Sequence, residues 1–173
     1  MIWKAKDRIF EGTGVIMGVL NVTPDSFSDG GTHNGYEDAL AFAEEMLAQG
    51  ADIIDVGGES TRPGSAAPSI QEELDRVLPV VCELVARGVC VSVDTRHWEV
   101  AQACVKAGVH IINDVSGFRD PKMREVAAAS DCGLVVMHML GEPGTMQNDP
   151  HYDDVVTEVR DYLIAQAQLL EGM

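Results

Sequence analysis

Polar side chains stand at the ends of several short apolar runs in the 173-residue sequence. Asn21 ends the first run, Asp94 ends the third and Asn113 ends the fourth. A carboxylate only accepts hydrogen bonds, whereas a carboxamide both donates and accepts. Asp94 and Asn113 side by side would therefore recognise the amino-pyrimidinone edge of a flat heterocycle. The alternative is that Asp94 caps the helix that follows it and that Asn113 binds backbone groups.

Arginines also lie just beyond these runs, at Arg62, Arg96 and Arg119. The sequence holds 12 basic and 28 acidic residues. Arginines in its loops therefore indicate either an anionic ligand, such as a phosphate or diphosphate, or ion pairs with the abundant carboxylates. The first loop also offers hard oxygen donors, the ligands that Mg²⁺ prefers. These donors are Asn21, Asp25, Ser28 and Asp29.

Five apolar runs are the elements that must position these side chains. They begin at residues 15, 52, 89, 109 and 134 and are rich in Val, Ile and Leu, which is typical of parallel strands buried on both faces. In parallel α/β folds, ligands bind at the carboxyl ends of the strands, where these polar residues lie. We expect a hairpin over 2–11 and helices over 36–49, 70–87, 97–107, from 121, and over about 153–171.

The spacing of the strands leaves two folds open. The runs begin about 30 residues apart, so eight β-α units would need about 240 residues, the size of a TIM (β/α)₈ barrel. A doubly wound open sheet of five strands also fits a chain of 173 residues. If Asp94 points to the inner face, alternation along the third strand turns Ser92 and Cys90 the same way, and it leaves Val91 and Val93 to pack against helices.

The composition limits the classes of partner. A net charge of −16 repels nucleic acid and anionic membrane surfaces, whose binding requires clustered Lys and Arg. No apolar run reaches the roughly 18 residues of a membrane span. The four cysteines are scattered without a C-x-x-C pair, as is typical of reduced cysteines in a cytoplasmic protein. We therefore expect a cytoplasmic protein that binds small molecules.

Several strings resemble the motifs of dihydropteroate synthase, the sulfonamide target within the pterin-binding enzyme family. The family's first signature resembles MGVLNVTPDSFSDGG at 17–31, and its second resembles ADIIDVGGESTRPGS at 51–65. Three further strings follow in the family's order: VSVDT, GVHIINDVSG and VVMHMLGEPGTMQNDPHYDDVVTEV. The resemblance implies an incomplete TIM barrel: a single pterin-binding domain over 1–173, with a hairpin cap at 1–13 and five β-α units over 14–171.

The resemblance also implies an activity. The family is a transferase of folate biosynthesis that condenses 6-hydroxymethyl-7,8-dihydropterin diphosphate with 4-aminobenzoate, giving 7,8-dihydropteroate and diphosphate, with Mg²⁺ as cofactor. Matched motif by motif, it implies catalytic roles for Asn21, Arg62 and Asp94, with Asn21 at the metal.

The substrate-binding residues that the resemblance implies divide by substrate. Asp94 and Asn113 would bind the pterin edge between the apolar side chains of Val115 and Met137. The diphosphate would contact Thr61 and Arg62. The aminobenzoate would contact Phe27 and Pro63.

The family also carries three later motifs that this sequence does not contain: D-P-G-x-G-F-G-K, a lysine-bearing S-x-K and R-x-H. They supply further pterin and diphosphate ligands, so we expect the 173-residue chain alone to be inactive. The alternatives are a non-catalytic pterin-binding remnant, one half of a split enzyme, or the pterin domain of a methyltetrahydrofolate methyltransferase. The strings NVTPDSFSDGG and STRPGS argue against the methyltransferase, because in the family these loops serve the diphosphate and the aminobenzoate, which a methyltransferase does not bind. Family members form homodimers through late helices that are absent here.

Overall fold

The structure is a computed structural model, and it describes residues 2–12, 14–23, 32–59, 67–142, 145–147 and 149–173. Strands and helices alternate along most of this chain. The elements are β1 (Ile2–Ala5), β2 (Arg8–Glu11), β3 (Met17–Asn21), α1 (Thr32–Ala48), β4 (Ile53–Gly57), α2 (Ile70–Ala86), β5 (Val91–Asp94), α3 (Trp98–Ala107), β6 (Ile111–Asp114), α4 (Pro121–Ala128), β7 (Gly133–Val136) and α5 (Val155–Glu171).

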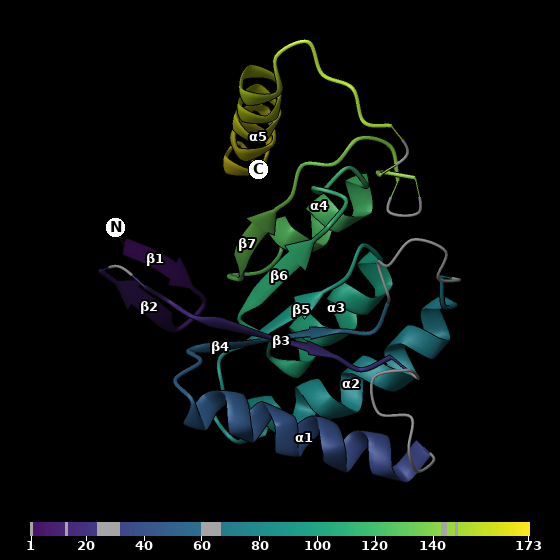
Figure 1. Ribbon diagram of the computed structural model, residues 1–173. Coiled ribbons are helices and arrows are strands. Elements are labelled where there is room, and N and C mark those ends of the chain that lie inside the picture. The colour runs from purple at the N-terminus through teal and green to yellow at the C-terminus, as the bar shows by residue number, and fades with distance from the viewer. Residues whose placement is uncertain (1, 13, 24–31, 60–66, 143–144, 148) are drawn as a thin grey trace.

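The main sheet is parallel, and its strands lie in chain order from β3 to β7 (Figure 1). A doubly wound sheet would reverse its strand order at a switch point. Here each β-α unit instead adds the next strand on the same side, as in a barrel. The open-sheet alternative is therefore wrong, and the fold is an incomplete α/β barrel. The antiparallel pair β1 and β2 forms the hairpin that the sequence predicts before the first parallel strand.

Local signals explain where the helices begin and end. Ser69 and Glu72 form a reciprocal capping box at the start of α2, which satisfies backbone N–H groups that the helix leaves free. Asp120 caps α4 through the backbone N–H of Lys122. His97 is the residue that precedes α3, so the alternative that Asp94 caps this helix is wrong.

The two faces of the sheet have different chemistry. Val91 and Val93 are fully buried in the cluster between the sheet and its helices, whereas Cys90 packs on the opposite face with Ile53 and Ile111. The alternation predicted for β5 is therefore confirmed. The hairpin covers the amino-terminal end of this inner face, where Trp3 joins the same cluster. The carboxyl ends of the strands lie at the other end of the sheet (Figure 1).

The main sheet has two edge strands in the part of the chain that the structure describes. There, β3 and β7 each pair with a single strand of the main sheet. Val19 of β3 is 55% exposed and Ile16 just before it is 56% exposed, which is unusual for apolar side chains beside a parallel strand. A search of the described helices finds none that is long and apolar enough to cross a membrane.

Candidate functional site

One row of residues crosses the carboxyl ends of four strands. The strand register pairs Asn21 with Gly57, Gly57 with Asp94, and Asp94 with Asn113. A Cβ atom on Gly57 would lie 3.5 Å from Asp94 Oδ2 and 3.6 Å from Asn21 Oδ1. Because Gly57 has no side chain, the carboxylate and the amide oxygen face a common space beside it. The structure thus brings together Asn21, Asp94 and Asn113, as the sequence predicts.

Asp55 lies one step deeper in the sheet and belongs to the same site. It is only 3% exposed, and its Oδ2 accepts a hydrogen bond of 3.0 Å from Asn113 Nδ2. Its Oδ1 is buried and has no hydrogen-bond partner among the described residues. Sequence reasoning missed this residue. The signal was a charged residue inside an otherwise apolar strand, two positions before Gly57 and therefore on the same face.

The carboxylates in this site repel one another in a poorly hydrated space. Burial, as the largest cause, and the negative charges of Asp55, Glu73, Asp114 and Glu59 together raise the pKa of Asp94 to about 7. Burial also raises the pKa of Asp55, although the neighbouring Ser92 hydroxyl and the Asn113 amide oppose this effect. A ligand that brings N–H donors or positive charge would stabilise the ionised form of both carboxylates.

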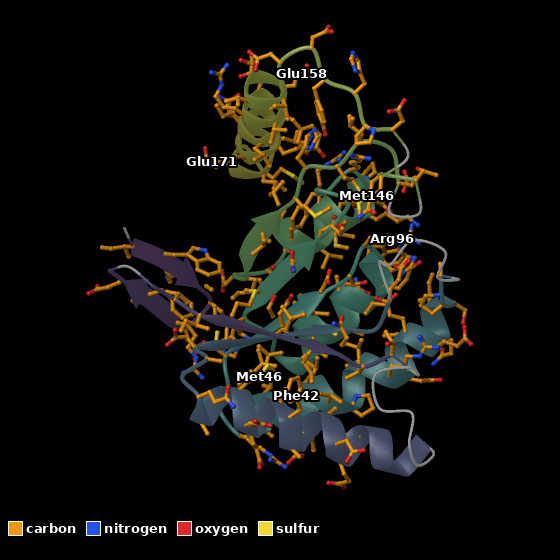
Figure 2. All side chains as sticks on the ribbon, viewed as in Figure 1. Phe42, Met46, Arg96, Met146, Glu158 and Glu171 are labelled. Carbon is orange, nitrogen blue, oxygen red and sulfur yellow. The ribbon has the colours of Figure 1, made fainter. Side chains whose placement is uncertain are left out.

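Two of the three candidate arginines bind groups of the protein itself. Arg119 donates to the backbone oxygens of Met139 and Gly141. Arg96 donates from Nε and Nη2 to the two carboxylate oxygens of Glu59, each over 2.9 Å. The ion-pair alternative therefore holds for Arg96 in this structure, whereas Arg119 binds backbone carbonyl groups instead of a carboxylate. Figure 2 shows Arg96 at the end of the sheet away from the hairpin.

The remaining predicted residues divide between two groups. Val115 lies in the turn after β6, and Met137 directly follows β7; both are partly buried, so they lie at the ends of strands next to the polar row. The others fall outside the described residues. These are Asp25, Phe27, Ser28, Asp29, Thr61, Arg62 and Pro63.

Glu73, Thr95 and His97 form a second polar cluster next to Asp94. Sequence reasoning did not find it. Glu73 in the first turn of α2 is fully buried. It accepts a hydrogen bond of 2.6 Å from Thr95 Oγ1, and its other oxygen lies 2.6 Å from His97 Nδ1. This contact with Glu73 raises the pKa of His97. The signal was the helical spacing of Glu73 and Val77, which puts this acid on the buried stripe of α2.

Among the described residues, Asn21 could supply one protein oxygen to a Mg²⁺ ion. Mg²⁺ takes one or two protein oxygens and fills its other positions with water and phosphate. Asn21 is exposed at the end of β3, and its amide oxygen faces the space beside Gly57. The chemistry of this donor suits the ion.

Comparisons with known proteins agree with this geometry. The sequence profile described as pterin binding enzyme matches residues 17–173. Dihydropteroate synthase of Escherichia coli strain K12 is 54% identical over 152 residues, which cover 87% of this chain and 54% of that protein. The chain therefore spans about half the length of this curated relative.

Two solved structures show the same fold. Burkholderia cenocepacia dihydropteroate synthase complexed with 7,8-dihydropteroate superposes with a TM-score of 0.86 at 43% identity, covering 99% of this chain and 58% of that one. The Yersinia pestis enzyme in a sulfonamide drug complex gives a TM-score of 0.90 at 44% identity, covering 99% of this chain and 63% of that one. These neighbours are TIM barrels, so the parallel sheet corresponds to consecutive units of such a barrel. The chain belongs to the pterin-binding enzyme family.

Proposed function

We propose that this chain forms the amino-terminal part of a dihydropteroate synthase and carries its pterin-binding residues. The substrates would be 6-hydroxymethyl-7,8-dihydropterin diphosphate and 4-aminobenzoate. The observation that carries the proposal is the row of Asn21, Asp94 and Asn113 at the carboxyl ends of β3, β5 and β6, with Asp55 beneath it. Identity to dihydropteroate synthases along most of this chain supports the same assignment.

The pterin would be recognised by the two carboxylates, Asp94 and Asp55, and by the amide of Asn113. Its amino group and ring N–H groups are donors, and Asp94 and Asp55 are acceptors when ionised. Asn113 donates through Nδ2 to Asp55, which fixes the orientation of the amide and leaves its oxygen free to accept an N–H from the ligand. Val115 and Met137 would supply the apolar walls at the ends of the neighbouring strands.

The chemical step needs positioning more than it needs a strong base. The amine nitrogen of 4-aminobenzoate forms a bond with the methylene carbon of the pterin, the bond from that carbon to the diphosphate oxygen breaks, and the nitrogen releases one proton to solvent. Asp94 would stabilise positive charge that develops on the pterin as the diphosphate leaves. Holding both substrates in line supplies much of the remaining rate enhancement.

Mg²⁺, when bound, would neutralise charge on the departing diphosphate. Asn21 is the residue that would hold it, through the amide oxygen beside Gly57. Thr61 and Arg62 at the diphosphate, and Phe27 and Pro63 at the aminobenzoate, stay predictions. So do the cytoplasmic location and the homodimer.

Fusion to the later barrel units of a relative tests this proposal. The 173-residue sequence lacks the later family motifs, so the chain alone should bind a pterin but form no dihydropteroate. Fused to the carboxyl-terminal part of the Escherichia coli relative, it should form dihydropteroate at a measurable rate, and the Asp94→Ala fusion should not. A folded fusion without activity would contradict the synthase assignment. Dihydropteroate formation by the chain alone at the rate of a full-length relative would contradict the expected inactivity.

A further inference from the structure

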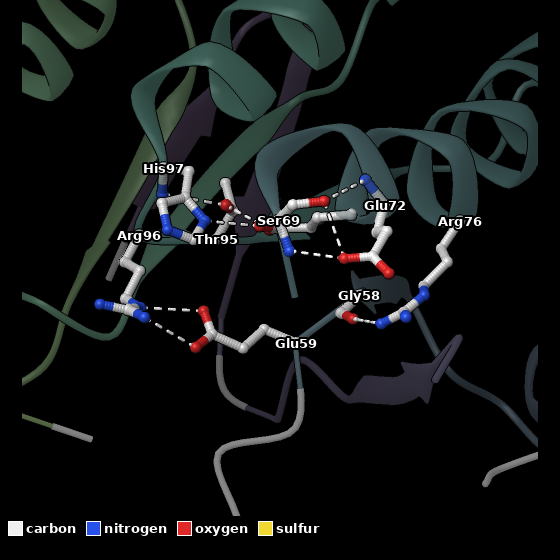
Figure 3. A network of polar contacts seen from close by, with 9 residues as sticks. Gly58, Glu59, Ser69, Glu72, Arg76, Thr95, Arg96 and His97 are labelled. Carbon is white, nitrogen blue, oxygen red and sulfur yellow. Dashed lines mark hydrogen bonds and ion pairs between the residues drawn. The ribbon is translucent and has the colours of Figure 1, made fainter. Parts of the chain in front are cut away.

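Glu59 and Arg96 lie just beyond the end of the ladder that joins β4 and β5. Gly57 is paired with Asp94 in the register, and Glu59 and Arg96 each lie two residues further along their segments. Their side chains face each other and form a bidentate ion pair, with both N···O distances at 2.9 Å (Figure 3). Paired donors and acceptors of this kind fix direction as well as distance. The pair therefore joins the segment after β4 to the segment after β5, directly beyond Asp94.

The segment between Gly57 and Glu59 is held on its other side by α2. A Cβ atom on Gly58 would lie 2.6 Å from Val77 Cγ2, so this backbone packs against the helix without room for a side chain. Arg76 of the same helix donates to the Gly58 carbonyl oxygen over 3.1 Å. The end of β4 is thus fixed between α2 on one side and Arg96 on the other.

The carboxylates of Glu59 and Glu73 lie close together, which explains why the positive charge of Arg96 is useful beside them. Ligand atoms of Glu59, Glu73 and His97 all lie within 4.8 Å of one another, so two carboxylates approach each other beside the site. Each of these oxygens already has a protein partner: Arg96 for Glu59, and Thr95 and His97 for Glu73. Arg96, Thr95 and His97 therefore already contact the carboxylate oxygens that a metal ion would bind.

We propose that Arg96 is a positioning residue for pterin binding, which holds Glu59 and the end of β4 in place so that Gly57 and Asp94 keep their spacing. The proposal rests on the proposed pterin site. In this role Arg96 touches no substrate. It offsets the charge of Glu59 beside Glu73 and keeps the two segments in register. Without it, the unpaired Glu59, whose side chain is only 10% exposed, would move towards water.

Binding measurements on the 173-residue chain test this role. Isothermal titration would use two ligands, 6-hydroxymethyl-7,8-dihydropterin and its diphosphate ester. Arg96→Gln should weaken both by the same factor, at least tenfold, and Arg96→Lys, which keeps the charge but not the bidentate geometry, should show a smaller loss. The double variant Glu59→Gln with Arg96→Gln leaves no unpaired charge, and its affinity should return to within about threefold of the wild type. Arg87→Gln is the control, because Arg87 pairs with Glu83 and Glu44 at the far end of α2.

The outcomes separate this role from the alternatives. A loss confined to the diphosphate ester and not restored in the double variant would show that Arg96 binds the diphosphate directly, and it would overturn the proposal. Unchanged affinity in Arg96→Gln would also overturn it. If Arg96→Gln fails to fold, the comparison of Arg96→Lys with the double variant carries the same test. A wild-type chain that binds neither ligand would instead contradict the proposed function, and this inference with it.

Discussion

Replacing Asp94 by Asn should stabilise the fold at pH 8 and leave its stability nearly unchanged at pH 4. Burial and four neighbouring carboxylates raise the pKa of Asp94 from its ordinary value of 3.8 to about 7. An acid whose pKa rises on folding holds its proton more tightly in the native state. Its contribution to stability is therefore complete below its ordinary pKa, and it is lost as the pH rises from there to about 7. Asn mimics the protonated form at every pH.

The size of this effect follows from the same values. The difference between 3.8 and about 7 corresponds to about 4 kcal/mol of unfolding free energy above pH 7. Part of it comes from carboxylates such as Asp55 and Glu73, whose own protonation adjusts when the charge at Asp94 is removed. We therefore expect the variant to gain about 2 to 4 kcal/mol at pH 8.

Urea unfolding of both proteins, followed by circular dichroism at pH 4, 6 and 8, measures this gain directly. Asp131→Asn is the matched control, because Asp131 is exposed on the loop before β7, and its substitution should change little at any pH. The reasoning would be refuted if Asp94→Asn lowered the stability at pH 8, or if the difference between the two proteins did not depend on pH.

Four further substitutions test other parts of the structure. Gly58→Ala should cost about 1–3 kcal/mol of unfolding free energy through overpacking against α2, with a Cβ only 2.6 Å from that helix. Gly57→Ala, whose Cβ would meet its neighbours at 3.5 Å or more, should spare stability and weaken pterin binding; equal effects on stability would contradict this. His97 should titrate by NMR above its ordinary pKa of 6.5, and Glu73→Gln should lower that value. The stability that this pair adds should be present below pH 6.5 and lost as the pH rises through the raised pKa. The chain should self-associate through its exposed sheet edge, as measured by light scattering, and Val19→Lys should reduce this; unchanged association would exclude that edge.

The strands and helices could be predicted from the sequence, but the order of the strands in the sheet could not. Apolar runs and capping residues such as Ser69 and Asp120 are local signals, and the strands and helices follow them closely. Strand order is set by contacts between distant segments, so periodicity alone left a barrel and a doubly wound sheet equally open. The resemblance to a family favoured the barrel, and the order from β3 to β7 agrees with it.

The site could be predicted where strand alternation determines the direction of a side chain. Asp94 and Asn113 lie opposite each other in the register of β5 and β6, so alternation along each strand turns their side chains to the same face. Asp55 was missed because its strand is buried on both faces and reads as one apolar run. The contact between Glu73 and His97 joins residues 24 positions apart on different elements. For Arg96, the residue type fits an anionic ligand and an ion pair equally well, and only the position of Glu59 decides between them.

Titration of 6-hydroxymethyl-7,8-dihydropterin diphosphate into the chain tests the central claim most directly. If the row at the carboxyl ends of the strands is a pterin site, the wild type should bind and Asp94→Ala should lose more than about 2 kcal/mol of binding free energy, about 30-fold in affinity, because the ligand's N–H donors lose their acceptor. Asp131→Ala, at an exposed position, should bind like the wild type. Equal affinity of Asp94→Ala and the wild type would contradict the account.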